Sequence, residues 1–251
     1  MFEDSANSRT FSRRSIHGQV AHEIGKRIVR GDYQPGSTLP TEIDSSADLN
    51  VSRTAYREAV MVLAAKGLVE SRPRTGTRVR SRDEWNMLDP DILAWTFNSG
   101  PSESQIRSLF EIRYIIEPAA AELAASRATK FSIAQISTAL EDMRLAGSDV
   151  DASVESDLRF HQSILRSADN EMLTPLGYLI ESALAETFRL SSEIPGAREN
   201  SIPMHENVFF AIRDGKAELA RKKMEELLVA ALDDVNYVIS APEKKIKRKF
   251  R

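Results

Sequence analysis

The 251-residue chain contains no cysteine, so it has neither disulfides nor thiolate metal ligands, and we expect it to work in a reducing compartment, the cytoplasm. It has no long apolar run, which excludes a membrane-spanning helix and a membrane partner. The opening segment, MFEDSANSRTFSRRS, has no hydrophobic block and is not expected to be a secretory signal. No HExxH or comparable catalytic motif is present, so nothing in the motifs points to an enzyme.

Charge is distributed unevenly along the chain, although its net charge is only −3. Residues 1–80 hold 13 Lys and Arg against 9 Asp and Glu, whereas residues 81–242 hold 15 against 27. Residues 243–251 hold 6 basic side chains and 1 acidic one. The first third is therefore the only globular part with a positive balance, and a polyanionic partner is expected to bind there.

The order of apolar segments and polar breaks predicts two domains and a tail. We expect a first domain at 12–80, a linker at 81–101, a second domain at 102–240 and a basic tail at 241–251. The second domain shows helical patterns and no convincing strand, which predicts an antiparallel helical bundle. The tail is either a solvated end or a source of non-specific attraction to phosphates.

The first domain has the element order of a winged helix-turn-helix. The stretch SIHGQVAHEIGKRIVRG has apolar residues at helical spacing, and a short helix follows that Thr41 caps or Pro40 begins. Asn50 stands where the chain must turn sharply, because asparagine tolerates the left-handed conformation. Ser52 then caps a helix over 53–66, and the short extended segments LVESR and TRVRS on either side of PRTG predict a hairpin.

The third helix of this domain presents hydroxyls and guanidiniums on the side opposite its apolar residues. In a helix-turn-helix the second helix of the motif enters the major groove with its N-terminus first. Hydroxyls suit phosphates there, and arginines suit base edges or phosphates. A solvated helix face is the alternative, but the hairpin that follows is also basic. We therefore predict that duplex DNA contacts Ser52, Arg53, Thr54, Arg57, Arg72 and Arg74.

Three segments resemble the GntR family of bacterial regulators and, within it, the FadR-type subfamily with a helical FCD ligand domain. They are GDYQPGSTLPTEIDSSADLNVSRTAYREAVMVLAAKGLVESRPRTGTRV, LFEIRYIIEPAAAELAASRAT and DLRFHQSIL. The resemblance covers roughly residues 15–240, and the linker WNMLDPDILAW is similar to the galactonate-type branch. It implies a dimeric repressor whose affinity for operator DNA is changed by a small acid. The DNA contacts it implies are Ser52, Arg53, Thr54, Arg57 and the wing tip near Arg74 and Gly76.

One position of the first domain departs from the family pattern. After LPTE many members carry an arginine that contacts DNA, and this chain has Ile43. The resemblance therefore implies either a different site preference or compensation by neighbouring residues.

Three polar residues of the second domain are candidate metal ligands. Asp157 and His161 are spaced i, i+4 and share a helix face, and His205 comes from a later helix. A carboxylate and two imidazoles can hold Zn²⁺, Ni²⁺ or Mn²⁺, although a plain helix-surface pair fits the same spacing. The resemblance implies a site of this Asp, this His and two later histidines, but Leu227 stands at the last position. A three-ligand metal site and a metal-free pocket for a polyol both stay open.

Arg113 lies among Ile112, Ile115 and Ile116, which we expect to be core residues. A buried arginine needs a partner, because an unpaired buried charge is very costly. That partner is either Glu117 or Glu111, in a salt bridge, or the carboxylate of a ligand held by the guanidinium. Because the resemblance places a pocket nearby, we favour the ligand. The expected effector-binding residues are Arg113, Asp157, His161, His205, Glu111 and Asn207.

The expected fold class is mainly α, with an N-terminal winged helix-turn-helix followed by an all-α antiparallel bundle. The expected function is repression of a sugar-acid catabolic operon by a homodimer that a small carboxylate effector releases from a palindromic operator. One alternative is a metal-dependent enzyme acting on a small acid, but an enzyme would not need the basic winged module. The other is a DNA-binding protein without an effector, which a solid apolar core in the bundle would favour.

Overall fold

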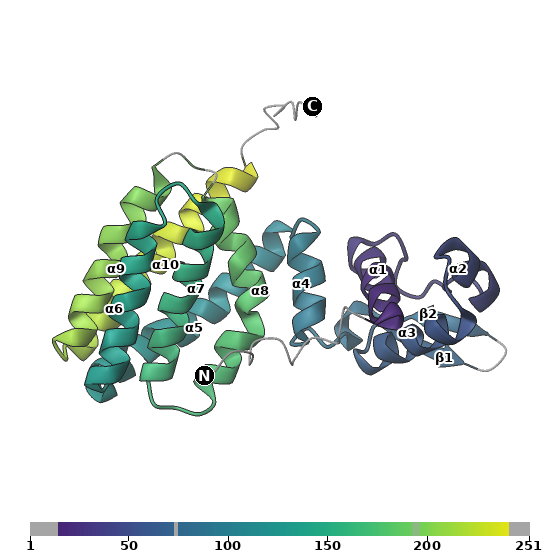
Figure 1. Cartoon of the computed structure of the whole chain (residues 1–251), viewed down its shortest axis with the longest axis horizontal. Helices are drawn as coiled ribbons and strands as arrows, with labels where there is room; N and C mark the ends of the chain where they lie inside the picture. Colours follow the sequence, from purple (N-terminus) through teal and green to yellow (C-terminus); the bar gives the residue numbers. More distant parts are fainter. Residues whose placement is uncertain (1–14, 73–74, 193, 195, 241–251) are drawn as a thin grey trace. The chain divides into compact units, whose positions relative to one another are not determined.

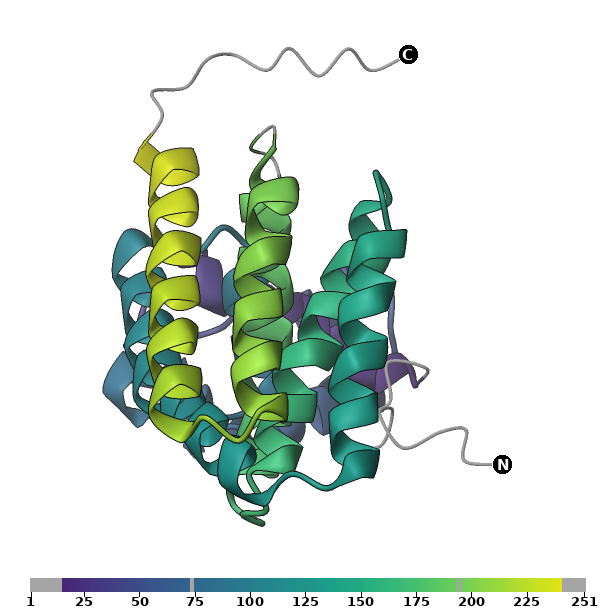
Figure 2. The same cartoon turned by 90° about the vertical axis from the view of Figure 1, so that its left-hand side faces the viewer.

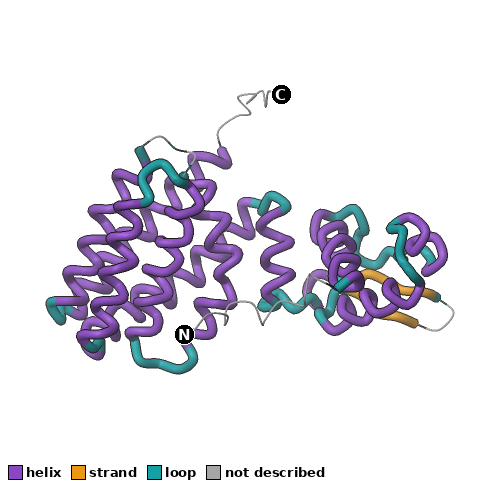
Figure 3. The backbone as a smooth tube through the Cα atoms, viewed as in Figure 1, coloured by secondary structure: helices purple, strands orange, loops and turns teal. Residues whose placement is uncertain are grey.

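The computed structural model of the chain describes residues 15–72, 75–192, 194 and 196–240. Within them the protein has ten α-helices, one short 3-10 helix and a two-stranded hairpin (Figures 1 and 3). Contacts divide the chain into two compact units, Met1–Pro101 and Ser102–Arg251. The expected class, a winged helix-turn-helix followed by a helical bundle, is confirmed. None of the described helices combines the length and apolar character needed to cross a membrane.

The first unit follows the predicted element order. Thr41 Oγ1 accepts a hydrogen bond from the Asp44 amide and so caps the second helix. Asn50 turns the chain with a φ of 52°, and Ser52 Oγ accepts from the Ala55 amide at 3.1 Å. The elements are α1 (Ile16–Arg30), α2 (Glu42–Asp48), α3 (Arg53–Ala65), β1 (Val69–Arg72), β2 (Gly76–Val79), the 3-10 helix Arg82–Glu84 and α4 (Pro90–Asn98).

The segment expected to be a linker includes α4, which packs against α1 within the first unit. Lys66 Nζ, at the end of α3, lies 2.9 Å from Asp89 Oδ2 and 2.7 Å from Asp91 Oδ2. Trp95 of α4 is buried, and its Nε1–H donates to His22 Nδ1 of α1 at 2.7 Å. Ion pairs and buried apolar surface therefore make α4 part of the winged unit.

The second unit is a bundle of helices that run side by side (Figure 2). Its core is a cluster of buried alanine, leucine, isoleucine and phenylalanine side chains contributed by every helix except α8. The helices are α5 (Glu103–Arg127), α6 (Lys130–Leu145), α7 (Val150–Ser167), α8 (Leu173–Ser191), α9 (Ala197–Arg213) and α10 (Ala217–Ser240).

The expectation that Ile112 and Ile115 are core residues is wrong, because their side chains are 45% and 70% exposed. The buried stripe of α5 instead contains Arg113, Glu117 and Ala120. At 3.6 residues per turn, Ile112 lies about 100° and Ile115 about 160° around the helix from Arg113. Two charged residues thus occupy the inward face of α5, while two isoleucines face outward.

Candidate functional site

The start of α3 presents the residues that we predicted to contact DNA. Ser52, Arg53, Thr54 and Arg57 are all exposed. Arg53 forms no ion pair with the residues that the structure describes, and Arg57 Nε is as far as 3.9 Å from Glu42 Oε2. Guanidiniums with weak or no intramolecular partners can bind phosphate oxygens or base edges without first breaking a salt bridge.

The hairpin forms a wing beside this helix. Its strands are antiparallel, and Arg72 pairs with Gly76 at the tip end. Arg72 is exposed and lies 2.9 Å from Glu70 Oε1, while Gly76 has a φ of 84°, a conformation that favours glycine. The predicted contact Arg74 lies outside the described residues. The described strands of the wing therefore contribute two exposed arginines, Arg72 and Arg78, and a turn that favours glycine.

A shallow surface hollow lies between α2 and α3. It is lined by Ile43, Ser46, Ala47, Asn50, Val51, Ser52 and Arg53. The Ile43 side chain is 59% exposed there, so the position at which we noted a departure shares a surface with the predicted DNA contacts. An apolar side chain at this place can contact a thymine methyl but cannot hydrogen-bond to a base or a phosphate.

A cavity of about 200 Å³ lies within the second unit. Charged and imidazole groups on it come from Arg113, Asp157, His161 and His205. Hydroxyl, amide and carboxylate side chains also line it, from Ser153, Ser191, Ser192, Asn200, Ser201 and Asp234. A solid apolar core would have favoured a DNA-binding protein without an effector. The described part of the bundle does not have one, because polar side chains line this cavity.

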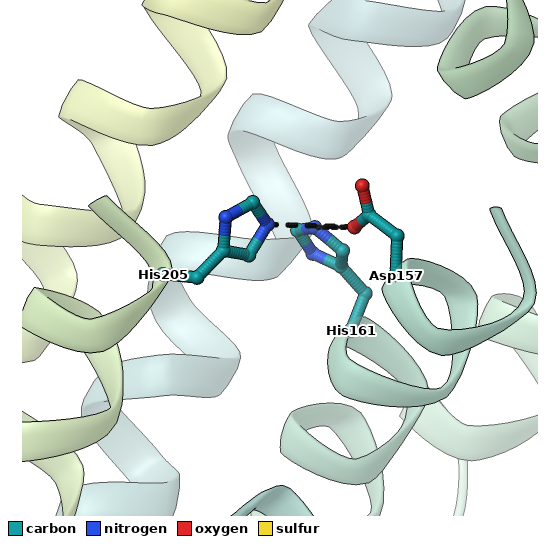
Figure 4. A group of neighbouring side chains, drawn as sticks. All are labelled: Asp157, His161 and His205. Atoms are coloured by element: carbon teal, nitrogen blue, oxygen red, sulfur yellow. Dashed lines mark ion pairs between the residues drawn. The ribbon is translucent and has the colours of Figure 1, made fainter. Parts of the chain in front are cut away.

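Asp157, His161 and His205 converge at this cavity, with their polar atoms directed toward one another (Figure 4). His161 Nε2 lies 3.2 Å and His205 Nε2 lies 3.4 Å from Asp157 Oδ1. The Nδ1 atom of His205 is 2.8 Å from the carbonyl oxygen of Ser201, so its N–H is directed at that carbonyl. Asp157 Oδ1 and His205 Nε2 make no hydrogen bond with the described residues.

The geometry of these three side chains fits a divalent cation. Their ligand atoms all lie within 4.8 Å of one another. Ligands that share a tetrahedral ion at 2.0–2.2 Å are about 3.4 Å apart, close to the two spacings from Asp157. Leu227 lines the same cavity and offers no ligand atom, so the donor set found among the described residues has three members.

Arg113 forms one of the two contacts that we left open, the salt bridge to Glu117. Its side chain is only 1% exposed, and its Nε–H donates to Glu117 Oε1 at 2.7 Å. Its guanidinium carbon lies 5.0 Å from the Phe110 ring centre and 5.1 Å from that of Phe188. The Nη1 atom has no hydrogen-bond partner among the described residues, although Arg113 lines the cavity. The salt bridge therefore uses Nε, and binding of a ligand carboxylate by Nη1 stays a prediction.

Two of the predicted effector residues do not reach the cavity. Glu111 and Asn207 are both exposed, and neither lines it. Each is two residues from a lining residue, which turns its side chain about 200° around its helix. Sequence reasoning missed Ser153 and Ser201, although each stands four residues before a predicted ligand and so shares its helix face.

The buried charges determine one another's protonation. Burial opposes the charge on Glu117, but Arg113 and His161 outweigh it and lower the pKa of Glu117 to about 2. Burial likewise opposes the charge on His161, but Glu117 and Asp157 raise its pKa to about 9. Burial acts against ionised Asp157 too, yet His205 and His161 hold its pKa well below the usual range. Without metal, His161 is therefore an imidazolium between two carboxylates at neutral pH.

We expect His161 to make the metal-free protein less stable at alkaline pH. A histidine pKa raised from 6.5 to about 9 contributes stability that is complete below pH 6.5 and is lost as the pH rises through 9. The lowered pKa of Glu117 contributes stability that is complete above pH 4.5 and is lost as the pH falls toward 2. The two contributions are therefore both complete between pH 4.5 and 6.5.

Urea denaturation in the presence of a chelator measures this dependence. Between pH 6.5 and about 9.5 the wild-type protein should lose about 3 kcal/mol more unfolding free energy than the His161→Gln variant, since folding raises the pKa of His161 from 6.5 to about 9. Equal losses in the two proteins would show that His161 is not cationic in the folded chain.

The comparisons with known proteins agree with this arrangement. A family model described as "Bacterial regulatory proteins, gntR family" matches residues 16–79, and one described as "FCD domain" matches residues 108–230. The galactonate operon transcriptional repressor of Escherichia coli K12 is 36% identical over 202 residues, which cover 79% of this chain and 88% of that protein. The Uxu operon transcriptional regulator of the same organism is 34% identical over 160 residues, covering 63% of this chain and 60% of that protein. A solved structure of Lar, from a study of Listeria monocytogenes, is 18% identical, covers 88% of this chain and 97% of its own, and has a TM-score of 0.59, which supports the fold alone.

Proposed function

Because the chain belongs to the GntR family of bacterial regulatory proteins and carries an FCD domain, we propose that it represses a sugar-acid catabolic operon and releases its operator when a small carboxylate enters the cavity. It is a DNA-binding transcription regulator and not an enzyme. The observation that carries the proposal is the buried Arg113, whose Nη1 has no partner among the described residues and whose side chain lines a polar cavity. This function requires double-stranded operator DNA as a partner and places the protein in the cytoplasm.

Operator DNA is bound through the start of α3 and the wing. Arg53 and Arg57 are exposed and weakly engaged within the chain, as base or phosphate contacts must be before binding. We propose a homodimer, in which the two winged helix-turn-helix domains bind half-sites about one helical turn of DNA apart. Effector and operator binding are then coupled, so operator DNA must weaken effector binding by the same factor by which the effector weakens operator binding.

The effector that best suits the cavity is a sugar acid. Its carboxylate would pair with Arg113, since a guanidinium recognises a carboxylate through parallel N–H donors. Its hydroxyl groups would form hydrogen bonds with side chains such as Ser153, Asn200 and Asp234. If a fatty acid were bound instead, these polar side chains would have no hydrogen-bond partner on the ligand. Two similar proteins named for galactonate and Uxu operons support this chemical class.

We further propose that Asp157, His161 and His205 hold a divalent cation, with Zn²⁺, Ni²⁺ and Mn²⁺ as candidates. Three protein ligands leave at least one coordination position for water or for an oxygen of the effector, as in open metal sites. The cation would supply positive charge beside Arg113 and would polarise the oxygen bound to it. In the metal-free alternative, the two histidines hydrogen-bond to the effector directly.

A gel shift with the upstream DNA of the regulated operon tests the function. Hexonates, hexuronates, 2-keto-3-deoxy acids and short hydroxy acids are added in turn, each with and without a chelator. We expect one of the sugar acids to release the DNA, and we expect the chelator to weaken its effect. Release only by a non-acidic sugar or by an apolar acid would contradict the proposed effector class. Failure to bind any duplex at low salt would contradict the function itself.

A further inference from the structure

Glu117 is a buried carboxylate that lies behind the cavity and does not line it. Its two oxygens have different neighbours. Oε1 accepts from Arg113 Nε at 2.7 Å, and Oε2 lies 2.6 Å from His161 Nδ1, in an ion pair that is not aligned as a hydrogen bond. All three side chains are at most 3% exposed, so water does not compete for these contacts. Glu117 thus joins the arginine expected to bind the carboxylate to a histidine expected to bind a cation.

A neutral imidazole carries one N–H and one lone pair, and the neighbours of the ring decide which nitrogen carries which. A carboxylate oxygen 2.6 Å from Nδ1 can only accept, so the proton of His161 belongs on Nδ1. The lone pair is then on Nε2, the atom that lies 3.2 Å from Asp157 Oδ1. His205 reaches the same state through a backbone carbonyl, because its Nδ1 is 2.8 Å from the oxygen of Ser201.

We propose that Glu117 is a positioning residue of the metal site, which keeps the Nδ1 proton on His161 so that the Nε2 lone pair is available to a divalent cation. The proposal rests on cation binding by Asp157, His161 and His205. Through its other oxygen, Glu117 also accepts from Nε of Arg113, a residue that lines the cavity, and Nη1 of that guanidinium has no hydrogen-bond partner among the described residues. One buried side chain therefore orients both the cation ligand and the group that binds the effector's carboxylate.

The Glu117→Gln variant tests this role sharply, because an amide has one acceptor and one donor end. Arg113 Nε is a donor, so it retains the amide oxygen at the Oε1 position. The amide nitrogen then takes the Oε2 position and donates to His161 Nδ1. The ring has to accept there and to carry its proton on Nε2, where no lone pair is left for a cation. Size and packing are nearly unchanged.

Calorimetric titration of the full-length metal-free protein with Zn²⁺ alone gives the first measurement. We expect Glu117→Gln to bind Zn²⁺ about 10- to 100-fold more weakly than the wild type. The matched control is Glu122→Gln on the same helix, where the carboxylate pairs, among the described residues, only with the half-exposed Arg221 at the surface. The control should bind Zn²⁺ as the wild type does, and circular dichroism should show both variants to be folded.

Nitrogen-15 NMR of the histidine rings gives the second measurement and needs no variant. In the zinc-loaded wild type, His161 should show a protonated Nδ1 and a zinc-bound Nε2. Zinc bound through Nδ1, unchanged zinc affinity in a folded Glu117→Gln variant, or no zinc binding by the wild type would each overturn the proposal. Operator binding and its release by sugar acids are measured on the same samples. If operator binding and its release by sugar acids persist while one of these three outcomes is found, the positioning role of Glu117 is wrong and the proposed regulation stands.

Discussion

Replacing Arg53 with alanine should strongly weaken operator binding in a gel shift while leaving the fold and the proposed dimer intact. Arg53 opens α3, is exposed, and forms no ion pair with the described residues, so its loss removes no packing. A bidentate arginine–base contact is worth about 1–3 kcal/mol, and a dimer makes it twice. The expected loss is therefore about 2–6 kcal/mol, or at least about 30-fold in operator affinity.

Arg107→Ala is the matched control for this experiment. Arg107 is an exposed arginine of the second unit, paired with Glu103 on its own helix, and its removal should leave operator affinity unchanged. If Arg53 contacts a phosphate, its removal should also reduce the slope of log affinity against log salt concentration by about one for each DNA-binding domain. Unchanged affinity in Arg53→Ala would remove the assignment of α3 as the recognition helix.

Replacing Arg113 should leave operator binding in place and make it insensitive to the effector. Removing the guanidinium takes away the proposed partner of the carboxylate, a charge-assisted contact worth about 1.5–3 kcal/mol. The effector concentration needed for release should therefore rise at least about 10-fold, and titration of the operator complex with the effector measures it. Arg113→Ala also leaves Glu117 with only His161 as a counter-charge, and breaking a buried pair can cost about 3–5 kcal/mol of stability.

Arg113→Lys separates the two effects, because lysine keeps the positive charge beside Glu117 but lacks the planar set of donors. It should stay folded, bind the operator as the wild type does, and still need more effector. The matched control is Arg127→Lys, since Arg127 lies on the same helix and bonds to the carbonyl of Ala168 away from the cavity. A normal effector response in a folded Arg113→Lys variant would exclude Arg113 from effector binding.

Local chemistry explains why the helices of both units were predictable. Cap residues such as Ser52 and Asp89 stand before the helices α3 and α4, and their side chains accept from the first amides. Asn50 takes the left-handed conformation at the turn between α2 and α3. These features depend on a few neighbouring residues, so they can be predicted from one sequence without knowledge of any tertiary contact.

Which side chains of a helix point into the core and which point into solvent was less predictable. Ile112 and Ile115 were expected inside because they are apolar, but α5 turns Arg113 and Glu117 inward instead. Burial of two charges is tolerated there because they pair with each other and Glu117 also faces His161. A helix-period analysis ranks faces by their apolar content, so it assigns the wrong face when a buried ion pair replaces part of the core.

The sequence by itself determined the helices, the hairpin, the basic face of α3 and the Asp157–His161 pair, because each depends on residues close together in the chain. Only the tertiary structure decided that His205 meets that pair, that Glu117 also faces His161, and that Glu111 and Asn207 lie outside the cavity. These contacts join helices far apart in sequence, and their geometry is set by how each helix is rotated when the bundle packs. That rotation is a compromise among all the side chains of the core, so no single segment specifies it.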